Sequence, residues 1–589
     1  MSTKDDINTR RGKISDLGLL LPYIKQHRFK LLLAVGLMLI SSLVSIIIPI
    51  LVRTAIDEHI VQRDANGLMM IALLAVGLTL VMNIANVFRA RVMAEIGQGS
   101  IRDIRDRVFA KLQLLPVKFF DHIPVGKVVT RLTSDVDALS ELVSNAIVSM
   151  IIDTIKLIGF LALMIWLDLR LTIVTLLCVP ILGFALTFLS TRIGKAEDQE
   201  REQTSVVNAN LQESISGVRV IQAFQAQDFF FDKFETENHR LLKAGLRTIS
   251  TYAYFWPTVD LSWTISTAAI LYFGGRWVLD GTTTVGTLVA FNTYSGQFFG
   301  PLRGLTQAYR IIQRALAGAV RLNQILTTPT ETEVTLPLMP EIKGEVEFVN
   351  VSFGYDENDV VLHNISFKAE PGKTVALVGH TGAGKTSIIN LLCRFYNPVE
   401  GKILVDGLDI NQYDLQSYRK QIGLVLQEPF LFSGTLRDNL LFGAPQATDA
   451  EIWQALETVG LAESFKKHNI TLDTVLTERG ANFSTGQRQL ISFARALISN
   501  PRILILDEAT AHVDTLTEQK VQQALAKLLT GRTSFVIAHR LSTIRNADLI
   551  LVIGNGRILE SGTHEQLLAL KGEYWQLCHS QLNGGQTLQ

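Results

Sequence analysis

The residues with the clearest chemistry form one glycine-rich stretch behind a short apolar run. The stretch is Gly379-His380-Thr381-Gly382-Ala383-Gly384-Lys385-Thr386, followed by Ser387. Its glycines let backbone N–H groups wrap a phosphate chain, its lysine brings a positive charge to the outer phosphates, and its threonine hydroxyl is a ligand for Mg²⁺. The stretch predicts a site for a nucleoside triphosphate, with the N-terminus of the next helix favouring the anion.

A second polar group ends another apolar run, Arg502-Ile503-Leu504-Ile505-Leu506-Asp507-Glu508. We expect Asp507 to hold Mg²⁺, directly or through water, and Glu508 to polarise the attacking water as general base or orienter. An Asp-Glu pair at a strand end is by itself compatible with an ordinary surface. Following a phosphate-binding stretch, it predicts hydrolysis of the bound nucleotide.

A third stretch, Ser484-Thr485-Gly486-Gln487, leads directly into an apolar helical pattern. A loop of small polar residues at a helix start can hold a phosphate. Thr485 places a branched side chain where a bare backbone would approach a phosphate more closely.

The elements that must position these residues belong to an α/β domain near the C-terminus. Strands are expected over 346–351 and 374–378, and a helix over 388–395. A proline-containing linker precedes them. Before the linker lie six apolar segments of about 20 residues, each enough for a helix to cross ~30 Å of hydrocarbon. These segments are 31–52, 68–88, 146–167, 171–189, 252–273 and 285–305.

The connections between the apolar segments alternate in length. Those after the second and fourth segments are long, charged and helix-patterned, so we expect helices two to five to continue far into the cytoplasm. Each long connection turns at an aromatic-rich piece, one around Phe119 and Phe120, the other around Phe224 and Phe229. Exposed aromatic residues need a partner surface, and the soluble domain of this or another chain is the natural one. Basic residues in the first 30 positions predict a cytoplasmic N-terminus.

Some charges fall within the apolar segments. Asp153 and Lys156 are three apart on one helix, and Asp260 lies on another. A charge in lipid is costly, so these residues should face a cavity or each other. Substrate contact and a structural role both stay open. The fifth and sixth segments are the least apolar, as expected of helices that line a polar path.

Composition excludes several classes of protein. The 589 residues carry zero formal net charge, which gives no electrostatic case for nucleic-acid binding. The apolar fraction is 48%. The three cysteines, Cys178, Cys393 and Cys578, are far apart and have no metal-like spacing, so neither a disulfide framework nor a zinc site is expected. The N-terminus does not have the pattern of a cleavable signal peptide.

These motifs, in this order, resemble the ATP-binding cassette (ABC) superfamily in its exporter arrangement, from about residue 25 to 582. The resemblance implies an all-α transmembrane domain of six helices with the type IV exporter fold, followed by an α/β P-loop NTPase domain. It implies that Tyr355 stacks on adenine, Gln427 reaches Mg²⁺, His539 contacts the γ-phosphate and Asp514 belongs to the D-loop. Ser484, Thr485, Gly486 and Gln487 stand at the signature motif, and the aromatic turns match the coupling helices.

The resemblance further implies that two chains meet head to tail, so that Ser484 faces the ATP of the partner. The expected function is ATP-driven export of drugs, lipids or peptides across the inner (cytoplasmic) membrane. An ATP-gated channel or a non-pumping regulatory subunit is weakened by the presence of Glu508 and His539. A soluble nucleic-acid ATPase, an importer and a peptidase-bearing exporter are disfavoured.

Thr485 departs from the family's usual glycine, while Lys385, Asp507, Glu508 and His539 all match. One intact and one altered half-site on the same chain favour a heterodimer, and a homodimer that tolerates threonine is the alternative. The expected parts are a cytoplasmic segment (1–29), a transmembrane domain (30–326), a linker (327–343), an ATP-binding cassette (344–582) and a tail (583–589).

Overall fold

The computed structural model describes residues 16–18, 21–331, 336–356, 359–507, 515–537 and 544–584. It divides into two compact units. The first is Met1–Ala110 with Gly126–Thr327, and the second is Lys111–Val125 with Thr328–Gln589. Glu508, Asp514 and His539 lie outside the described residues.

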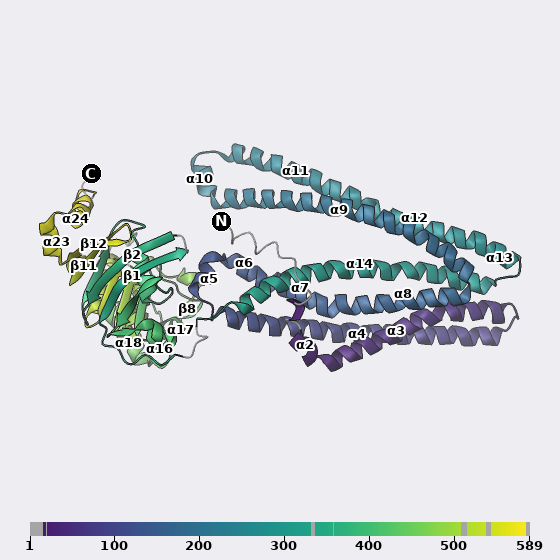
Figure 1. Ribbon diagram of the computed structural model, residues 1–589, viewed down its shortest axis with the longest axis horizontal. Helices are drawn as coiled ribbons and strands as arrows, with labels where there is room; N and C mark the ends of the chain where they lie inside the picture. The colour runs from purple at the N-terminus through teal and green to yellow at the C-terminus, as the bar shows by residue number, and fades with distance from the viewer. Residues whose placement is uncertain are drawn as a thin grey trace. The chain divides into compact units, whose positions relative to one another are not determined.

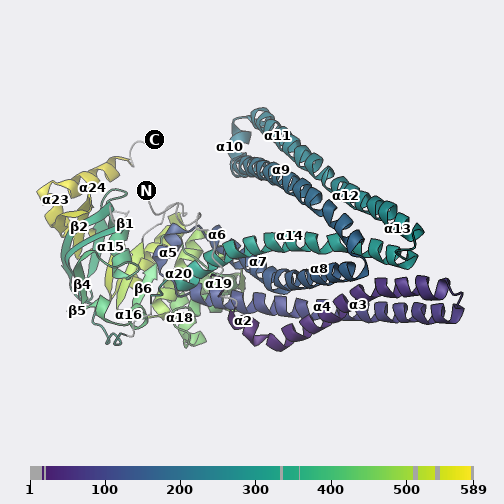
Figure 2. The same ribbon diagram turned by 45° about the vertical axis from the view of Figure 1, so that its right-hand side comes forward.

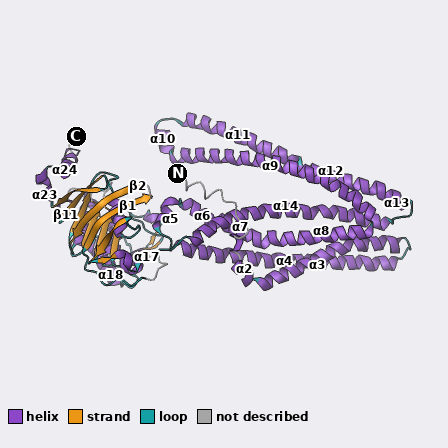
Figure 3. Cartoon of the chain, in the orientation of Figure 1, coloured by secondary structure: helices purple, strands orange, loops and turns teal. Residues whose placement is uncertain are grey.

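The first unit is helical (Figures 1 and 3). Its main helices carry the six predicted apolar segments and are joined by short helical turns. In chain order they are α2 (Leu21–Gln26), α3 (Arg28–Thr54), α4 (Ala65–Leu112), α6 (Val125–Thr130), α7 (Val136–Glu141), α8 (Ile147–Leu167), α9 (Leu169–Ser216), α10 (Val218–Ala223), α11 (Gln227–Ala253), α12 (Phe255–Ala269), α13 (Gly275–Leu279) and α14 (Val285–Thr327).

Two of these helices are far longer than a membrane requires. Both α4 and α9 have 48 residues, which at 1.5 Å per residue is roughly 70 Å, against a hydrocarbon core of about 30 Å. The predicted continuation of the second and fourth helices beyond their apolar segments is therefore seen. Among the described residues, length and composition alone mark Arg28–Ile60, Ala65–Leu112 and Val125–Leu167 as candidate membrane spans.

Helices α9, α11 and α12 form an arm that stands apart from the bundle of α3, α8 and α14 (Figures 1 and 2). The arm contacts that bundle near α13. Along the arm, α11 leaves a row of large apolar side chains exposed, namely Leu242, Leu246 and Ile249. Exposed apolar rows of this kind are typical of interaction sites.

The second unit contains the α/β domain. Its main sheet has the order β12-β11-β3-β10-β9-β6, in which β11, β3, β10, β9 and β6 pair in parallel and β12 pairs antiparallel with β11. These strands are β3 (Thr374–Val378), β6 (Ile422–Val425), β9 (Ile503–Asp507), β10 (Thr533–Ile537), β11 (Leu549–Gly554) and β12 (Arg557–Gly562). A second sheet, in the order β2-β1-β4-β5, consists of β1 (Val346–Asp356), β2 (Asp359–Ala369), β4 (Glu400–Val405) and β5 (Leu408–Asp409).

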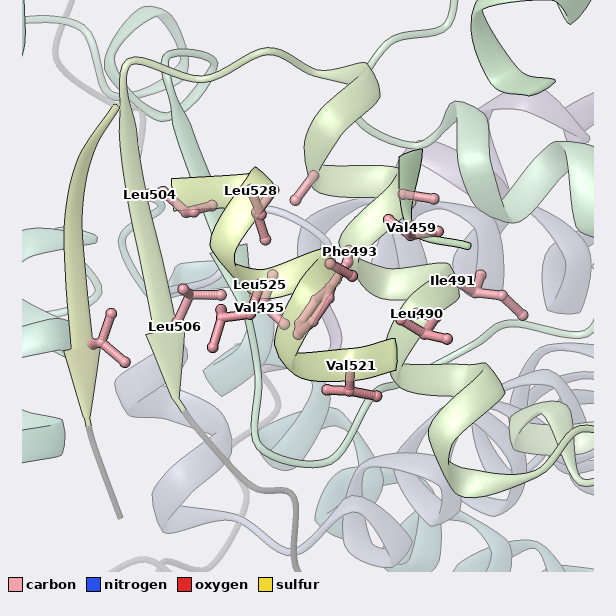
Figure 4. Packing of buried hydrophobic residues seen from close by; sticks show 14 of the residues in the cluster. Val425, Val459, Leu490, Ile491, Phe493, Leu504, Leu506, Val521, Leu525 and Leu528 are labelled. Carbon is pink, nitrogen blue, oxygen red and sulfur yellow. The ribbon is translucent and has the colours of Figure 1, made fainter. Parts of the chain in front are cut away.

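Both faces of the main sheet are covered, which explains why its strands are continuous apolar runs rather than alternating ones. In β9, Leu504 and Leu506 join one core cluster, and Ile503 and Ile505 join the other. Figure 4 shows the first cluster, in which α20 (Thr485–Ile498) and α21 (Thr515–Leu529) bring Phe493 and Leu525 toward β9.

The predicted helix over 388–395 is shifted. Helix α15 spans Lys385–Leu392, so it begins three residues earlier and ends three residues earlier than expected. It begins at Lys385 because Gly384 is its left-handed N-cap. It ends before Arg394 because that residue has a φ of 53°, a conformation that no helix continues through. Strand β3 has the predicted bounds, and β1 extends five residues beyond its predicted end.

Candidate nucleotide-binding site

The glycine-rich stretch connects β3 to α15, as its pattern predicted. Gly379 has a φ of 153°, and a Cβ built on it would lie 2.1 Å from the backbone oxygen of Ile553 in β11. Only a residue without a Cβ fits this contact. The turn is closed by a hydrogen bond from the N–H of Ala383 to the carbonyl oxygen of His380, 3.1 Å. No side chain caps α15, so its first N–H groups face the loop as donors for an anion.

Lys385 points back into this loop. Its Nζ donates to the carbonyl oxygens of Gly379 and His380, at 2.7 and 2.9 Å, and the residue is buried. Burial lowers the pKa of Lys385, and the negative charge of Asp507 opposes that shift. The backbone carbonyls therefore hold a desolvated cation inside the loop, where it would meet the outer phosphates of a nucleotide.

Sheet order brings two predicted site residues, Asp507 and Gln427, to the same edge. In the parallel register, Asp507 at the end of β9 lies opposite Ile537 at the end of β10, and Val425 at the end of β6 lies opposite Leu506. Gln427 follows β6 by two residues and His539 follows β10 by two. The carboxyl ends of these strands therefore converge beside the phosphate loop, where parallel sheets place ligands.

The oxygen donors at this edge fit Mg²⁺. Thr386 offers a hydroxyl from the first turn of α15, Asp507 a carboxylate and Gln427 a side-chain amide. Mg²⁺ prefers oxygen ligands of this kind and commonly shares them with substrate phosphates and water.

Tyr355, in β1, lies against the side of α15. Its hydroxyl is 3.0 Å from the Oγ of the buried Ser387 and accepts a hydrogen bond from Nδ2 of Asn390 at 3.2 Å. Its ring stands edge-on to Tyr396 at a centroid distance of 5.1 Å. Tyr355 is thus attached to the same helix whose first turn is predicted to bind the phosphates.

The signature stretch forms the start of α20. Ser484 is the N-cap: its Oγ accepts from the N–H of Gln487 at 3.2 Å, and Oε1 of Gln487 accepts from the N–H of Ser484 at 2.9 Å. Thr485 is the first helical residue and receives a hydrogen bond from Nη2 of Arg488 at 3.3 Å. It does not have a positive φ, so its backbone does not require glycine. Threonine is therefore accommodated without backbone strain. Its side chain would affect only a ligand or partner that binds at the start of α20.

The three charged residues within the predicted apolar segments lie on α8 and α12. Asp153 lies against α14, because a Cβ built on Gly304 would be 2.0 Å from its Oδ2. The structure therefore puts this carboxylate at a contact between α8 and α14. Lys156 lies one turn further along α8, and Asp260 lies exposed on α12.

One group of contacts beside the site could not be predicted from any sequence pattern. Tyr396, Arg419 and Glu331 join the far end of α15 to segments that are distant in the chain. A hydrogen bond between such segments leaves no periodic pattern, so only the folded structure reveals it.

Comparison with known proteins covers nearly the whole chain. Residues 31–302 match the model of the ABC transporter transmembrane region, and residues 362–511 match the ABC transporter model. An ATP-dependent lipid A-core flippase of Syntrophus aciditrophicus is 36% identical over 95% of this chain and 93% of its own length. A probable multidrug resistance ABC transporter ATP-binding/permease protein of Bacillus subtilis, YheH, is 40% identical over 81% of this chain and 71% of its own.

A solved structure has the same architecture. The structure of a bacterial Atm1-family ABC exporter with ATP bound superimposes with a TM-score of 0.78 at 28% identity, covering 94% of this chain and 98% of the other.

Proposed function

The chain belongs to the ABC transporters, in the exporter arrangement that fuses a transmembrane region to an ATP-binding domain, and we propose that it is one half of a dimer that exports amphipathic compounds across the cytoplasmic membrane. The proposal depends on two features of the same chain. One is the phosphate loop, which Lys385 contacts through its Nζ, and the other is the set of long apolar helices. Hydrolysis at that loop supplies the free energy for transport.

We assign the site residues as follows. The phosphate loop and Lys385 bind the triphosphate, and Tyr355 stacks on adenine. Mg²⁺, held by Thr386, Asp507 and Gln427, would neutralise charge that develops on the phosphates. Glu508 orients the attacking water and His539 contacts the γ-phosphate. The other proposed contacts with bound nucleotide are Gly379, His380, Thr381, Gly382, Ala383, Gly384 and Ser387, with Asp514, Ser484, Thr485, Gly486 and Gln487 contributed across the dimer.

Two surfaces support assembly with a second chain. On the arm, Phe224, Phe229 and Phe231 beside α10 are all more than 60% exposed. On the ATP-binding unit, Phe430, Phe432 and Phe442 form an exposed group, with successive centroid distances of 4.9 and 4.7 Å. We propose that the arm of one chain docks on this group of the other. ATP would then favour the closed dimer because only that state completes both sites.

We further propose that the partner is a different half-transporter. Thr485 supports this, because it adds a branched side chain at the start of the helix that would face the partner's ATP. The alternative is a homodimeric lipid exporter in which threonine is tolerated. The proposed substrates are drugs, lipids or peptides, and the names of two relatives, a lipid A-core flippase and a multidrug resistance transporter, support the first two.

The test is ATP hydrolysis by the purified full chain in lipid nanodiscs, alone and with candidate partner chains. Glu508→Gln should lower turnover by roughly 10²- to 10⁴-fold, the usual contribution of a general base, while ATP binding is retained. Addition of Hoechst 33342, ethidium or phosphatidylethanolamine then identifies the substrate class by stimulation. Unchanged turnover in Glu508→Gln would overturn the catalytic assignment. A fully active complex of this chain alone would overturn the heterodimer.

A further inference from the structure

The first cytoplasmic turn, α5 (Val117–His122), is held by two adjacent side chains of its last turn. The carboxylate of Asp121 accepts a hydrogen bond from the hydroxyl of Tyr396. Next to it, Nε2 of His122 lies 3.5 Å from Oδ1 of Asp356, while its Nδ1 lies 2.8 Å from the carbonyl oxygen of Lys118. All of these residues belong to the second unit.

Tyr396 connects this turn to the tyrosine at the proposed adenine site. The residue is 8% exposed, and its ring stands edge-on to Tyr355 at 5.1 Å and to Phe353 at 5.5 Å. Burial raises the pKa of Tyr396, and the carboxylate of Asp121 raises it further. A tyrosine is already protonated at neutral pH, so the phenol donates this hydrogen bond to Asp121.

Two adjacent residues at the proposed adenine site, Tyr355 and Asp356, are thus both connected to α5. Tyr355 contacts Tyr396, which binds Asp121. Asp356 follows Tyr355 directly in the chain and lies next to His122. The phosphates would be held by the loop and by Lys385 at the N-terminal end of α15, whereas Tyr396 follows the C-terminal end of that helix.

A separate link anchors the beginning of the same turn. Arg419 donates to both carboxylate oxygens of Glu331, at 2.7 and 3.3 Å, and to the carbonyl oxygens of Cys393 and Arg394 beyond the end of α15. The N–H of Glu331 donates to the carbonyl oxygen of Leu114 at 3.2 Å. The chain that enters α5 is therefore anchored independently of Tyr396. The last turn of α5 is the part that can respond to a change at Tyr396.

We propose that Tyr396 is a positioning residue that makes α5 respond to the adenine base of bound nucleotide, rather than to its phosphates. Stacking of adenine on Tyr355 restricts that ring, the ring restricts Tyr396, and Tyr396 holds Asp121. The inference rests on the proposed function, in particular on Tyr355 as the adenine contact. It gives this chain a reason to carry a buried tyrosine with a charged partner at this point.

The test is hydrogen–deuterium exchange of the full-length protein in lipid nanodiscs. The ligands are AMP-PNP and inorganic tripolyphosphate, each added until residues 379–386 are protected, which shows that the phosphate loop is occupied. AMP-PNP should slow exchange across Lys111–Val125 by about tenfold, the ratio expected for one hydrogen bond to a charged group. Tripolyphosphate should leave that segment unchanged.

In Tyr396→Phe, AMP-PNP should still protect residues 379–386 and the protection of Lys111–Val125 should be lost. Asp121→Asn is a second variant in case the buried substitution impairs folding, because Asp121 is exposed. The matched control is Tyr418→Phe. The Tyr418 hydroxyl is also buried and donates to the carbonyl oxygen of Leu392 in α15 at 2.8 Å, but it does not bind α5. This control should behave as wild type.

Equal protection of Lys111–Val125 by the two ligands would overturn the proposal, and so would wild-type protection in Tyr396→Phe and Asp121→Asn. Either result leaves the proposed function intact, because residues 379–386 still report nucleotide binding. If AMP-PNP fails to protect residues 379–386 in the wild type, the proposed function itself fails.

Discussion

At the scale of single residues, the phosphate loop depends on what its backbone touches. Gly379 leaves no space for a Cβ against the Ile553 oxygen, whereas a Cβ on Gly382 would meet nothing within 4 Å. Both residues have positive φ values, 153° and 84°. A side chain at either position would strain the backbone. Only at Gly379 would it also clash with a neighbouring atom.

Gly379→Ala is expected to destabilise the nucleotide-free protein well beyond the cost of conformation, because the new methyl group must displace a strand oxygen. Gly382→Ala should cost only about 1 kcal/mol, since it adds strain in the left-handed region without a clash. Thermal unfolding of both variants without nucleotide measures the difference. Equal losses of stability would show that the Ile553 contact does not matter.

A second prediction at this scale concerns Thr485. If its side chain loosens the partner's ATP site, Thr485→Gly should raise the ATP turnover of the assembled complex several-fold. Glycine at the first helical position costs up to about 1 kcal/mol of helix propensity, so the melting temperature should fall slightly while turnover rises. Turnover that stays the same, with the expected fall in melting temperature, would remove the argument for an altered half-site.

At the scale of elements, α14 is joined to the π-helical turn η3 (Arg131–Asp135) by a close approach and an ion pair. A Cβ built on Gly318 of α14 would lie 3.2 Å from the backbone oxygen of Asp135. Arg321 binds both carboxylate oxygens of Asp135, with Nε at 2.7 Å from Oδ2. Arg131 is 9% exposed beside the same carboxylate. Asp135 thus binds the guanidinium of Arg321, and its charge also acts on Arg131 where the helices meet.

Asp135→Asn should therefore destabilise the protein by about 3 kcal/mol, because it leaves the guanidinium groups without their buried counter-charge. The matched control is Asp137→Asn, two residues on. Its side chain is 61% exposed and lies 3.5 Å from Nη2 of Arg105, so its loss should cost less than about 1 kcal/mol. Denaturation of the full chain in lipid nanodiscs compares the two, and similar losses would contradict a structural role for Asp135.

At the scale of the whole molecule, both the arm and the ATP-binding unit expose apolar surfaces that a partner chain could cover. Phe224 is 79% exposed at the tip of the arm, and the row on α11 is exposed along its length. Large exposed apolar surfaces on a well-folded chain are typical of interaction sites. The chain therefore presents surfaces for a partner that sequence motifs alone only implied.

Phe224→Ser should leave the folding of the chain unchanged and reduce ATP turnover of the assembled complex by about 30-fold, since an aromatic anchor at an interface commonly carries 2 kcal/mol or more. Leu279→Ser is the control, because Leu279 is 90% exposed but lies at the end of α13, away from the tip of the arm. If both substitutions reduce turnover equally, the tip of the arm has no special part in assembly.

The local motifs determined much of this protein. Residues 379–386 were predicted to bind phosphate because a glycine-rich turn between an apolar strand and a helix has few other uses. Six segments of membrane length determined the fold class, and strand β3 was predicted to the residue. These features depend on short-range chemistry: the conformational freedom of glycine, the cost of burying polar groups in lipid, and the periodicity of apolar residues.

The tertiary structure decided what depends on distant segments meeting. Helix α15 begins and ends where Gly384 and Arg394 take left-handed conformations, which the apolar pattern did not show. Strand order, and not sequence, brings Asp507 and Gln427 to the edge that holds Lys385. The hydrogen bond from Tyr396 to Asp121 joins residues 275 positions apart. Such contacts require the loop-closure entropy to be offset by the whole fold, so no local stretch of the sequence encodes them.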